Sequence, residues 1–94
     1  MISQTHYLIR SKTDGSYLVA RPDPDTVDGY LLVFREYADA LSYLNTHAGD
    51  RAPEFGVESV SGVQLRGVLT RWGFAGLGLV EDPLIPQVQF MRQV

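Results

Sequence analysis

Five side chains near the N-terminus are the candidates for binding chemistry, because they gather basic and aromatic groups in one short stretch. They are His6, Arg10, Lys12, Tyr17 and Arg21. Guanidinium and ammonium groups donate charge-assisted hydrogen bonds to phosphate or carboxylate oxygens, and an imidazole carries a proton near neutral pH. The group therefore predicts a surface that binds an anion or a carboxylate-rich partner. The competing interpretation is an ordinary solvent-facing surface, since antiparallel sheets often keep one face wet.

Two strand-like runs bring these side chains onto one surface. Residues 7–10 and 17–21 are rich in β-branched and aromatic residues, and Asp14-Gly15 between them supplies the positive φ that a tight turn needs. A two- or four-residue turn around that pair places Arg10 opposite Val19. Side chains alternate along a strand, so the five candidates share one face of the hairpin. The opposite face carries the apolar residues Tyr7, Ile9, Leu18 and Ala20.

Three aspartates in the following loop invite comparison with a calcium site. The EF-hand places oxygen ligands at loop positions 1, 3 and 5, glycine at 6 and glutamate at 12. Counted from Asp23 through Asp25, the last three of these slots hold Val27, Asp28 and Phe34, so the match fails. Aspartates beside prolines also form turns, and a solvated loop explains them better. We expect no metal ion and no cofactor.

No arrangement typical of an enzyme's active site is recognisable in the sequence. The two histidines, His6 and His47, lack metal-ligand spacing, and the chain has no cysteine. His47 falls in the last turn of a predicted helix, where an imidazolium interacts well with exposed carbonyls. Glu81 and Asp82 are adjacent, so on a strand they point to opposite faces and cannot act together. We predict that the protein is not an enzyme.

Composition limits the classes of partner. The chain has 94 residues, so we expect a single domain over residues 1–94. The formal net charge is −3 and the pI is near 5.1, which argues against nucleic acid as a partner. The longest nearly apolar run, residues 72–80, contains three glycines and is too short to span a bilayer. With no signal-peptide pattern in residues 1–10, we expect a cytoplasmic protein without a membrane partner.

The rest of the chain alternates strands and helices. Residues 30–34 are apolar at every position, which is typical of a central strand covered on both faces. A first helix is predicted over residues 36–48, followed by a loop over residues 50–54 and a strand over residues 55–60. Residues 76–80 form a further strand, and the tail at residues 87–90 alternates polar and apolar side chains. That tail is predicted to be an edge strand, in this chain or added to a neighbouring subunit.

The second helix has the firmest local signal in the sequence. Ser61 and Gln64 have the spacing of a capping box, and Val60 and Leu65 are placed as a hydrophobic staple. The apolar stripe of this helix continues to Trp72, and Gly73 ends it.

These elements predict an α+β fold. We expect a mixed sheet of five to six strands, in the order β-hairpin, β, α, β, α, β and C-terminal edge strand. We expect the two helices to lie mainly on one face of the sheet. The other face, bearing His6, Arg10 and Arg21, would then be open to a second copy of the chain or to another protein.

Three segments of the chain resemble a known family. They are Val33-Phe34 leading into residues 38–44, then Val60-Ser61-Gly62-Val63-Gln64-Leu65, and the closing residues 79–83. Over residues 30–83 this order of elements is similar to the SseB N-terminal domain family. The strand–helix junction at residues 34–41 also resembles small cyanobacterial families of unknown function that share an F-x-x-x-x-D-A-L pattern. The resemblance implies an α+β fold and supplies no catalytic residue.

Two functions follow from the sequence. The first is a non-enzymatic protein-interaction or regulatory module that associates with itself or with a protein partner. The alternative is a small-molecule or anion-binding domain with weak catalytic activity, in which Arg10, Lys12 and Arg21 donate hydrogen bonds to the anion and His6 carries a proton.

Overall fold

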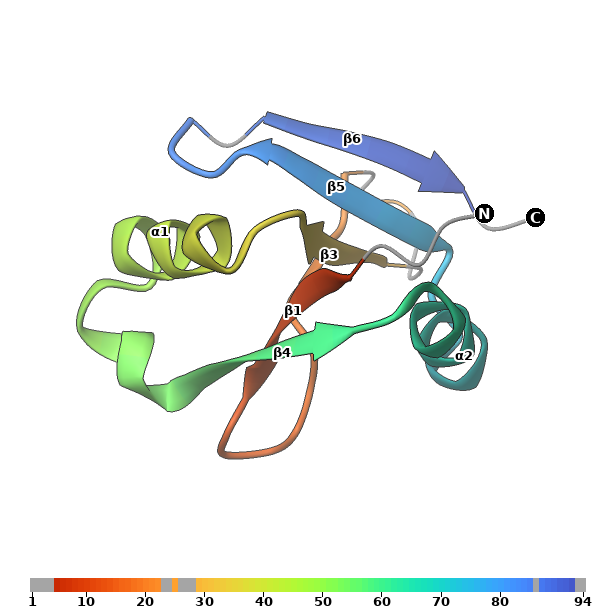
Figure 1. The fold of residues 1–94 in the computed structure, drawn as a ribbon, viewed down its shortest axis with the longest axis horizontal. Coiled ribbons are helices and arrows are strands. Elements are labelled where there is room, and N and C mark those ends of the chain that lie inside the picture. Colours follow the sequence, from red (N-terminus) through yellow and green to blue (C-terminus); the bar gives the residue numbers. More distant parts are fainter. Residues whose placement is uncertain (1–4, 23–24, 26–28, 86, 93–94) are drawn as a thin grey trace.

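A computed structural model describes residues 5–22, 25, 29–85 and 87–92. Within this part the chain forms a mixed six-stranded sheet and two α-helices (Figure 1), so the predicted α+β class and order of elements are confirmed. Residues 50–54, expected as a loop, belong instead to a short 3-10 helix, η1, over residues 49–54. The elements are β1 (His6–Ser11), β2 (Val19–Ala20), β3 (Tyr30–Phe34), α1 (Tyr37–His47), η1 (Gly49–Glu54), β4 (Phe55–Val60), α2 (Gly62–Trp72), β5 (Gly76–Asp82) and β6 (Gln87–Arg92).

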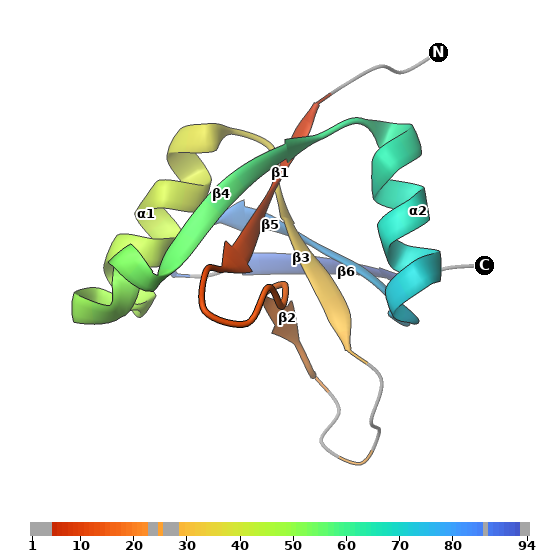
Figure 2. The ribbon, with the colours of Figure 1, turned by 90° about the horizontal axis from the view of Figure 1, so that it is seen from below.

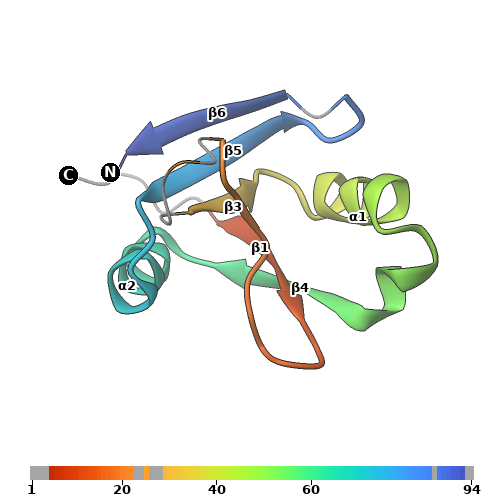
Figure 3. The same ribbon diagram turned by 180° about the vertical axis from the view of Figure 1, so that it is seen from behind.

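The strand order is β4-β1-β3-β5-β6, with β2 pairing to β3 outside this path. β3 runs parallel to β5, and the other strand pairs are antiparallel. β3 is central, as predicted, and Leu31 to Phe34 are buried. The C-terminal tail was predicted to pair either within this chain or with a neighbouring subunit. It forms β6, which pairs with β5 of the same chain. β4 and β6 are therefore the two edges of the sheet, as the view from behind shows (Figure 3).

The register of the first hairpin differs by two residues from the prediction. Arg10 pairs with Tyr17 instead of Val19, and the backbone of Ser11 bonds to that of Ser16 across the turn. Gly15 has a φ of 75°, the left-handed conformation that glycine adopts without steric cost. A shift of two residues preserves the side-chain faces, because the strand period is two. Tyr7, Ile9, Leu18 and Ala20 accordingly lie together in one core.

The two helices lie on opposite faces of the sheet, so the predicted placement on one face is wrong. Strands of the sheet pass between α1 and α2 (Figure 2). Adjacent residues of one strand point into different cores: Leu8 packs beneath α2 and Ile9 beneath α1. The buried residues of the α2 side are Leu8, Leu31, Val33, Val60, Leu65, Val68, Leu69 and Leu79, and those of the α1 side are Ile9, Leu32, Phe34, Ala40, Leu44 and Val80.

The direction of the chain across the sheet explains this arrangement. β3 and β4 both run antiparallel to β1, and β5 runs parallel to β3, so β3, β4 and β5 share one direction. α1 connects β3 to β4 toward one edge, whereas α2 connects β4 back to β5. Crossovers between parallel strands are right-handed, so two crossovers that travel in opposite directions place their helices on opposite faces.

The capping box that starts α2 forms as predicted. The Gln64 backbone N–H donates to Ser61 Oγ at 3.2 Å, and the Ser61 backbone N–H donates to Gln64 Oε1 at 2.9 Å. At the other end Gly73 adopts a φ of 71° and stops the helix. Because both ends of α2 are determined locally, its position over the sheet depends on the apolar stripe between them.

We expect Leu8→Ala and Ile9→Ala each to lower the free energy of unfolding by about 2–5 kcal/mol, the usual cost of emptying a buried aliphatic site. Both side chains are at most 1% exposed, although they point to opposite faces. Urea unfolding followed by circular dichroism measures both values. A loss under about 0.5 kcal/mol at Leu8, the range of exposed positions, would show that α2 does not cover its face.

Candidate functional site

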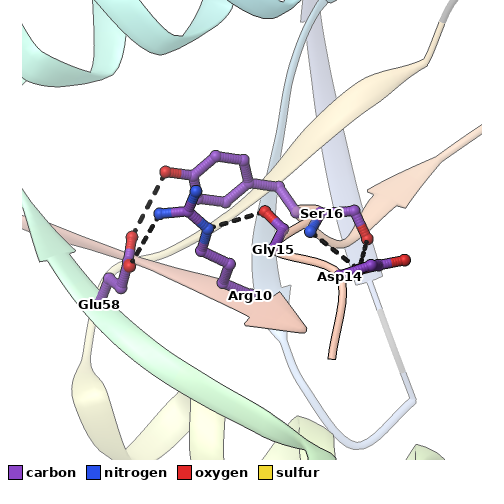
Figure 4. Close-up of polar contacts among 6 residues, drawn as sticks. Arg10, Asp14, Gly15, Ser16 and Glu58 are labelled. Atoms are coloured by element: carbon purple, nitrogen blue, oxygen red, sulfur yellow. Dashed lines mark hydrogen bonds and ion pairs between the residues drawn. The ribbon is translucent and has the colours of Figure 1, made fainter. Parts of the chain in front are cut away.

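Arg10, Tyr17 and Glu58 form a polar cluster where the first hairpin meets β4. Figure 4 shows Arg10 and Glu58 in this cluster. Arg10 Nη1 donates to the Glu58 carboxylate at 3.3 Å, and Tyr17 Oη donates to the same carboxylate at 3.4 Å. The Arg10 guanidinium also lies 4.8 Å from the centre of the Tyr17 ring. Its Nε donates to the backbone oxygen of Gly15 at 2.7 Å. The Glu58 carboxylate therefore links β4 to Arg10 of β1 and to Tyr17 beyond the turn, while Arg10 links to the turn itself through Gly15.

The electrostatics of the cluster keep the Tyr17 phenol protonated. Burial raises the pKa of Tyr17 above its usual 10.0, and the negative charge of Glu58 raises that pKa further. A protonated phenol is the form that donates to a carboxylate. The side chains of Arg10 and Glu58 are 39% and 43% exposed, so solvent screens their ion pair and its contribution to stability is small. The main role of the pair is to neutralise Glu58 and position Tyr17.

The hairpin turn has its own polar support. Asp14 Oδ1 accepts from the backbone N–H of Ser16 at 3.0 Å and from Ser16 Oγ at 2.7 Å. These hydrogen bonds lower the pKa of Asp14 below its usual 3.8, and the bond from the Ser16 backbone N–H has the largest effect. The turn presents the Gly15 oxygen to Arg10, so it helps to hold the cluster in place.

The structure brings together two of the five side chains that the sequence singled out. Arg10 and Tyr17 meet, whereas Lys12 and Arg21 are exposed and, within the described residues, share no hydrogen bond or ion pair with them. His6 is half-buried, and its Nδ1 has no hydrogen-bond partner among those same residues. His6, Arg10 and Tyr17 lie on the face that α2 covers, not on an open face.

The aspartate loop gives no metal site within the described residues. Asp23, Val27 and Asp28 of the rejected calcium comparison lie outside them. Among the residues that are described, no three His, Asp or Glu side chains are close enough together to hold a metal ion.

A half-open groove of about 370 Å³ lies between α2 and the strands β1 and β4. Its floor is apolar and includes Leu8 and Val60. One wall is a single stripe of α2, at the spacing i, i+3, i+4 and i+7 that lines up along one side of a helix. The wall residues are Gln64, Gly67, Val68 and Arg71. Tyr17 and Glu58 border the groove, so the polar cluster belongs to its rim.

Arg71 is the free charge of this groove. Its side chain makes no ion pair or hydrogen bond to any other described residue, although its charge acts through space on the Tyr17 hydroxyl. The next residue, Trp72, is 44% exposed and makes an edge-to-face contact with Tyr17, with ring centroids 5.1 Å apart. An unpaired guanidinium beside an exposed indole therefore marks one end of the groove.

Sequence reasoning missed this groove because it placed α2 on the other side of the hairpin. Gln64 and Arg71 lie outside the apolar stripe predicted for this helix, and Gly67 carried no local signal. The one available clue was the stripe at residues 64, 67, 68 and 71, which joins polar, small and apolar residues on one helical side.

A second depression, of about 230 Å³, lies on the α1 face, and two of its polar side chains, His47 and Arg51, are already engaged. It is lined in part by Tyr43, His47 and Arg51. His47 lies in the last turn of α1 as predicted, but its Nε2 contacts the Pro83 backbone oxygen at 3.0 Å. Arg51 pairs with Glu54 at 3.2 Å. This depression therefore has less free binding capacity than the groove beside α2.

We expect Tyr17→Phe to reduce the loss of stability at alkaline pH. Because the folded-state pKa of Tyr17 is raised, its stabilising contribution is complete below about pH 10 and is lost as pH rises through the folded-state value. Urea unfolding at about pH 8 and about pH 11 measures this loss in both proteins. Burial also raises the pKa of Tyr43, so Tyr43→Phe measures how much of the alkaline loss of stability comes from that second tyrosine. Equal losses in wild type and Tyr17→Phe would contradict the raised pKa.

The comparisons with known proteins show the fold and no family. No family model matches the chain, and no curated protein matches it. Among solved structures, Tic22 of Anabaena, described as a protein of protein transport, is similar to this chain with a TM-score of 0.59 at 16% sequence identity. The match covers 88% of this chain but 37% of Tic22, so what the two share is a fold over part of the longer protein. The resemblance of residues 30–83 to the SseB family is not confirmed by these comparisons and stays a resemblance.

Proposed function

We propose that the chain is a non-enzymatic protein-interaction module that binds an extended segment of a partner polypeptide along β4 and α2. The observation that carries this proposal is that the groove opens beside an edge strand. β4 pairs with β1 on one side and with no described strand on the other. Its outward backbone groups are therefore available, and an extended peptide can add to such an edge by main-chain hydrogen bonds.

The groove suits a polypeptide better than an enclosed small molecule. Its volume of about 370 Å³ is at the lower end for ligand pockets, and it is half open. The apolar floor at Leu8 and Val60 can receive a side chain, while Arg71 offers a charged contact beside it. Exposed aromatic and arginine residues such as Trp72 and Arg71 are the types that contribute most to protein interfaces.

The likeness to Tic22 is compatible with this proposal at the level of fold. Its description, protein transport, names a process that handles polypeptides. The groove, and not the likeness, is the basis for the function proposed here. No helix among the described residues has the length and apolar character needed to cross a membrane. The cytoplasm is the proposed compartment, on the sequence argument alone.

Self-association at β6 is a second candidate function, favoured by a different observation. β6 is the other edge of the sheet, Arg92 is its one charged residue, and Phe90 and Met91 are about 40% exposed. Edge strands that stay unpaired are usually protected by charges, prolines or bulges. We propose antiparallel pairing with β6 of a second copy. Pairing of one short strand buries less than the roughly 1,200 Å² of a stable interface, so the dimer would be weak.

The anion-binding alternative at the hairpin has less support. It needs Arg10, Lys12 and Arg21 to donate to one ligand with His6 beside it. The Arg10 guanidinium is already bonded to Glu58 and Gly15, which leaves it with fewer donors for a ligand.

A displayed library of random decapeptides, selected on the immobilised protein, tests the main proposal. Selected peptides should perturb the amide NMR signals of Glu58–Val60 and Gln64–Arg71, and change the fluorescence of Trp72, the single tryptophan of the chain. Failure to select any peptide, or perturbations confined to the α1 face, would refute binding at this groove.

Sedimentation equilibrium over a range of protein concentrations tests self-association. We expect the apparent mass of the wild type to rise above that of a monomer toward about millimolar concentration. Gln89→Lys should suppress this rise, because it places like charges on two facing edges. Asn45→Lys, an equal change of charge on exposed α1, is the control and should leave the rise intact. A monomer mass at every concentration would exclude the dimer.

A further inference from the structure

We infer that the segment bound in the groove carries an acidic side chain that pairs with Arg71 and, two residues away, an apolar side chain that fills a notch at Gly67. This inference rests on the proposed function and adds the chemistry of the partner. It rests on two independent observations. Gly67 has no structural requirement for glycine, and Arg71 has no ion-pair partner among the described residues.

Gly67 is not required by the fold. It lies in the middle of α2, where glycine is less favourable than alanine. It does not have the positive φ that would demand glycine, and an added Cβ would meet no atom within 4 Å. Neither backbone conformation nor internal packing therefore explains the residue. What does lie beside it is the groove.

The missing side chain at Gly67 leaves a notch in the groove wall. Gln64 and Arg71 project on either side of it, and Val68 lies next to it on the apolar floor side. An apolar side chain from a partner can approach the helix backbone at this point and cover Val68. Glycine at position 67 makes α2 less stable than alanine would. A bound segment would fill the space that the absent side chain leaves.

Arg71 differs from the arginines of the ion pairs. Arg10, Arg35 and Arg51 each pair with a glutamate at 3.2–3.3 Å. Among the described residues that line the groove, the one carboxylate belongs to Glu58, which already accepts from Arg10 and Tyr17. The groove thus presents a positive charge without its complement. A carboxylate from the partner would supply the matching negative charge, and it can accept two parallel hydrogen bonds from the Arg71 guanidinium.

The spacing of the two features matches an extended chain. Gly67 and Arg71 are four residues apart on α2, which is about 6 Å along the helix axis. Alternate side chains of a strand point to the same side and are about 6.5–7 Å apart. One extended segment can therefore reach both features with residues i and i+2. Its main chain would run along β4, where the edge is open.

A charge-swap selection tests the acidic contact. Random decapeptides are selected in parallel on wild type, Arg71→Glu and Arg66→Glu, the last being an exposed arginine of the same helix outside the groove lining. Wild type and Arg66→Glu should enrich Asp or Glu two positions from a bulky apolar residue. Arg71→Glu should enrich Lys or Arg at the acidic position, and replacing the acid by its amide should weaken wild-type binding about 10-fold.

The outcomes separate the two levels of the proposal. Peptides that bind the groove of wild type without an acidic preference, or a preference that Arg71→Glu leaves unchanged, would overturn the inference while the proposed function stands. Failure to select any peptide would instead remove the proposed function on which the inference rests.

Gly67→Ala tests the notch without endangering the fold. It should raise the thermal unfolding midpoint by a few degrees, since alanine favours the helix, and yet weaken the binding of a selected peptide at least about 3-fold. Gly62→Ala is the matched control, because a Cβ there also meets nothing within 4 Å but lies outside the groove lining. Equal peptide affinity in Gly67→Ala and wild type would overturn the notch.

Discussion

The burial of β3 on both faces is the constraint from which the rest of the architecture follows. Leu31 to Phe34 are each at most 3% exposed, and their side chains alternate between two separate cores. A strand of this kind is stable only when apolar layers cover both faces. α1 supplies one layer and α2 the other. The two helices reach opposite faces because the crossover from β3 to β4 and the crossover from β4 back to β5 run in opposite directions across the sheet.

The candidate site arises where this covering is incomplete. α2 packs over β1, β3, β4 and β5 through Leu65, Val68 and Leu69, and its stripe at residues 64, 67, 68 and 71 lines the groove beside β1 and β4. At the rim, Glu58 is committed to Arg10 and Tyr17, which leaves Arg71 without a partner. The same arrangement that completes the core thus places a free cation, an apolar floor and an open strand edge together. Shape and charge both arise from the position of one helix.

Local elements were predictable because short-range chemistry determines them. The capping box at Ser61 and Gln64 and the glycine stop at Gly73 depend on neighbours within one turn of helix. The face assignments of the first hairpin also survived an error of two residues in its register, because side chains alternate with period two. Residues 50–54 were missed as a 3-10 helix, an element whose boundaries have weak sequence signals.

Sequence patterns alone were enough to identify the central strand and both α-helices, to place the start and end of α2, and to show which side chains share a face of the first hairpin. The face that each helix covers could not be predicted in this way, because it depends on the spatial order β4-β1-β3-β5-β6 and on the direction of each crossover. Hydrophobic periodicity shows which side of a helix or strand is apolar, but it does not show which distant element packs against that side. For the same reason Glu58 could not be grouped with Gly67 and Arg71, since Glu58 belongs to β4, the other two belong to α2, and the two elements meet only after α2 packs.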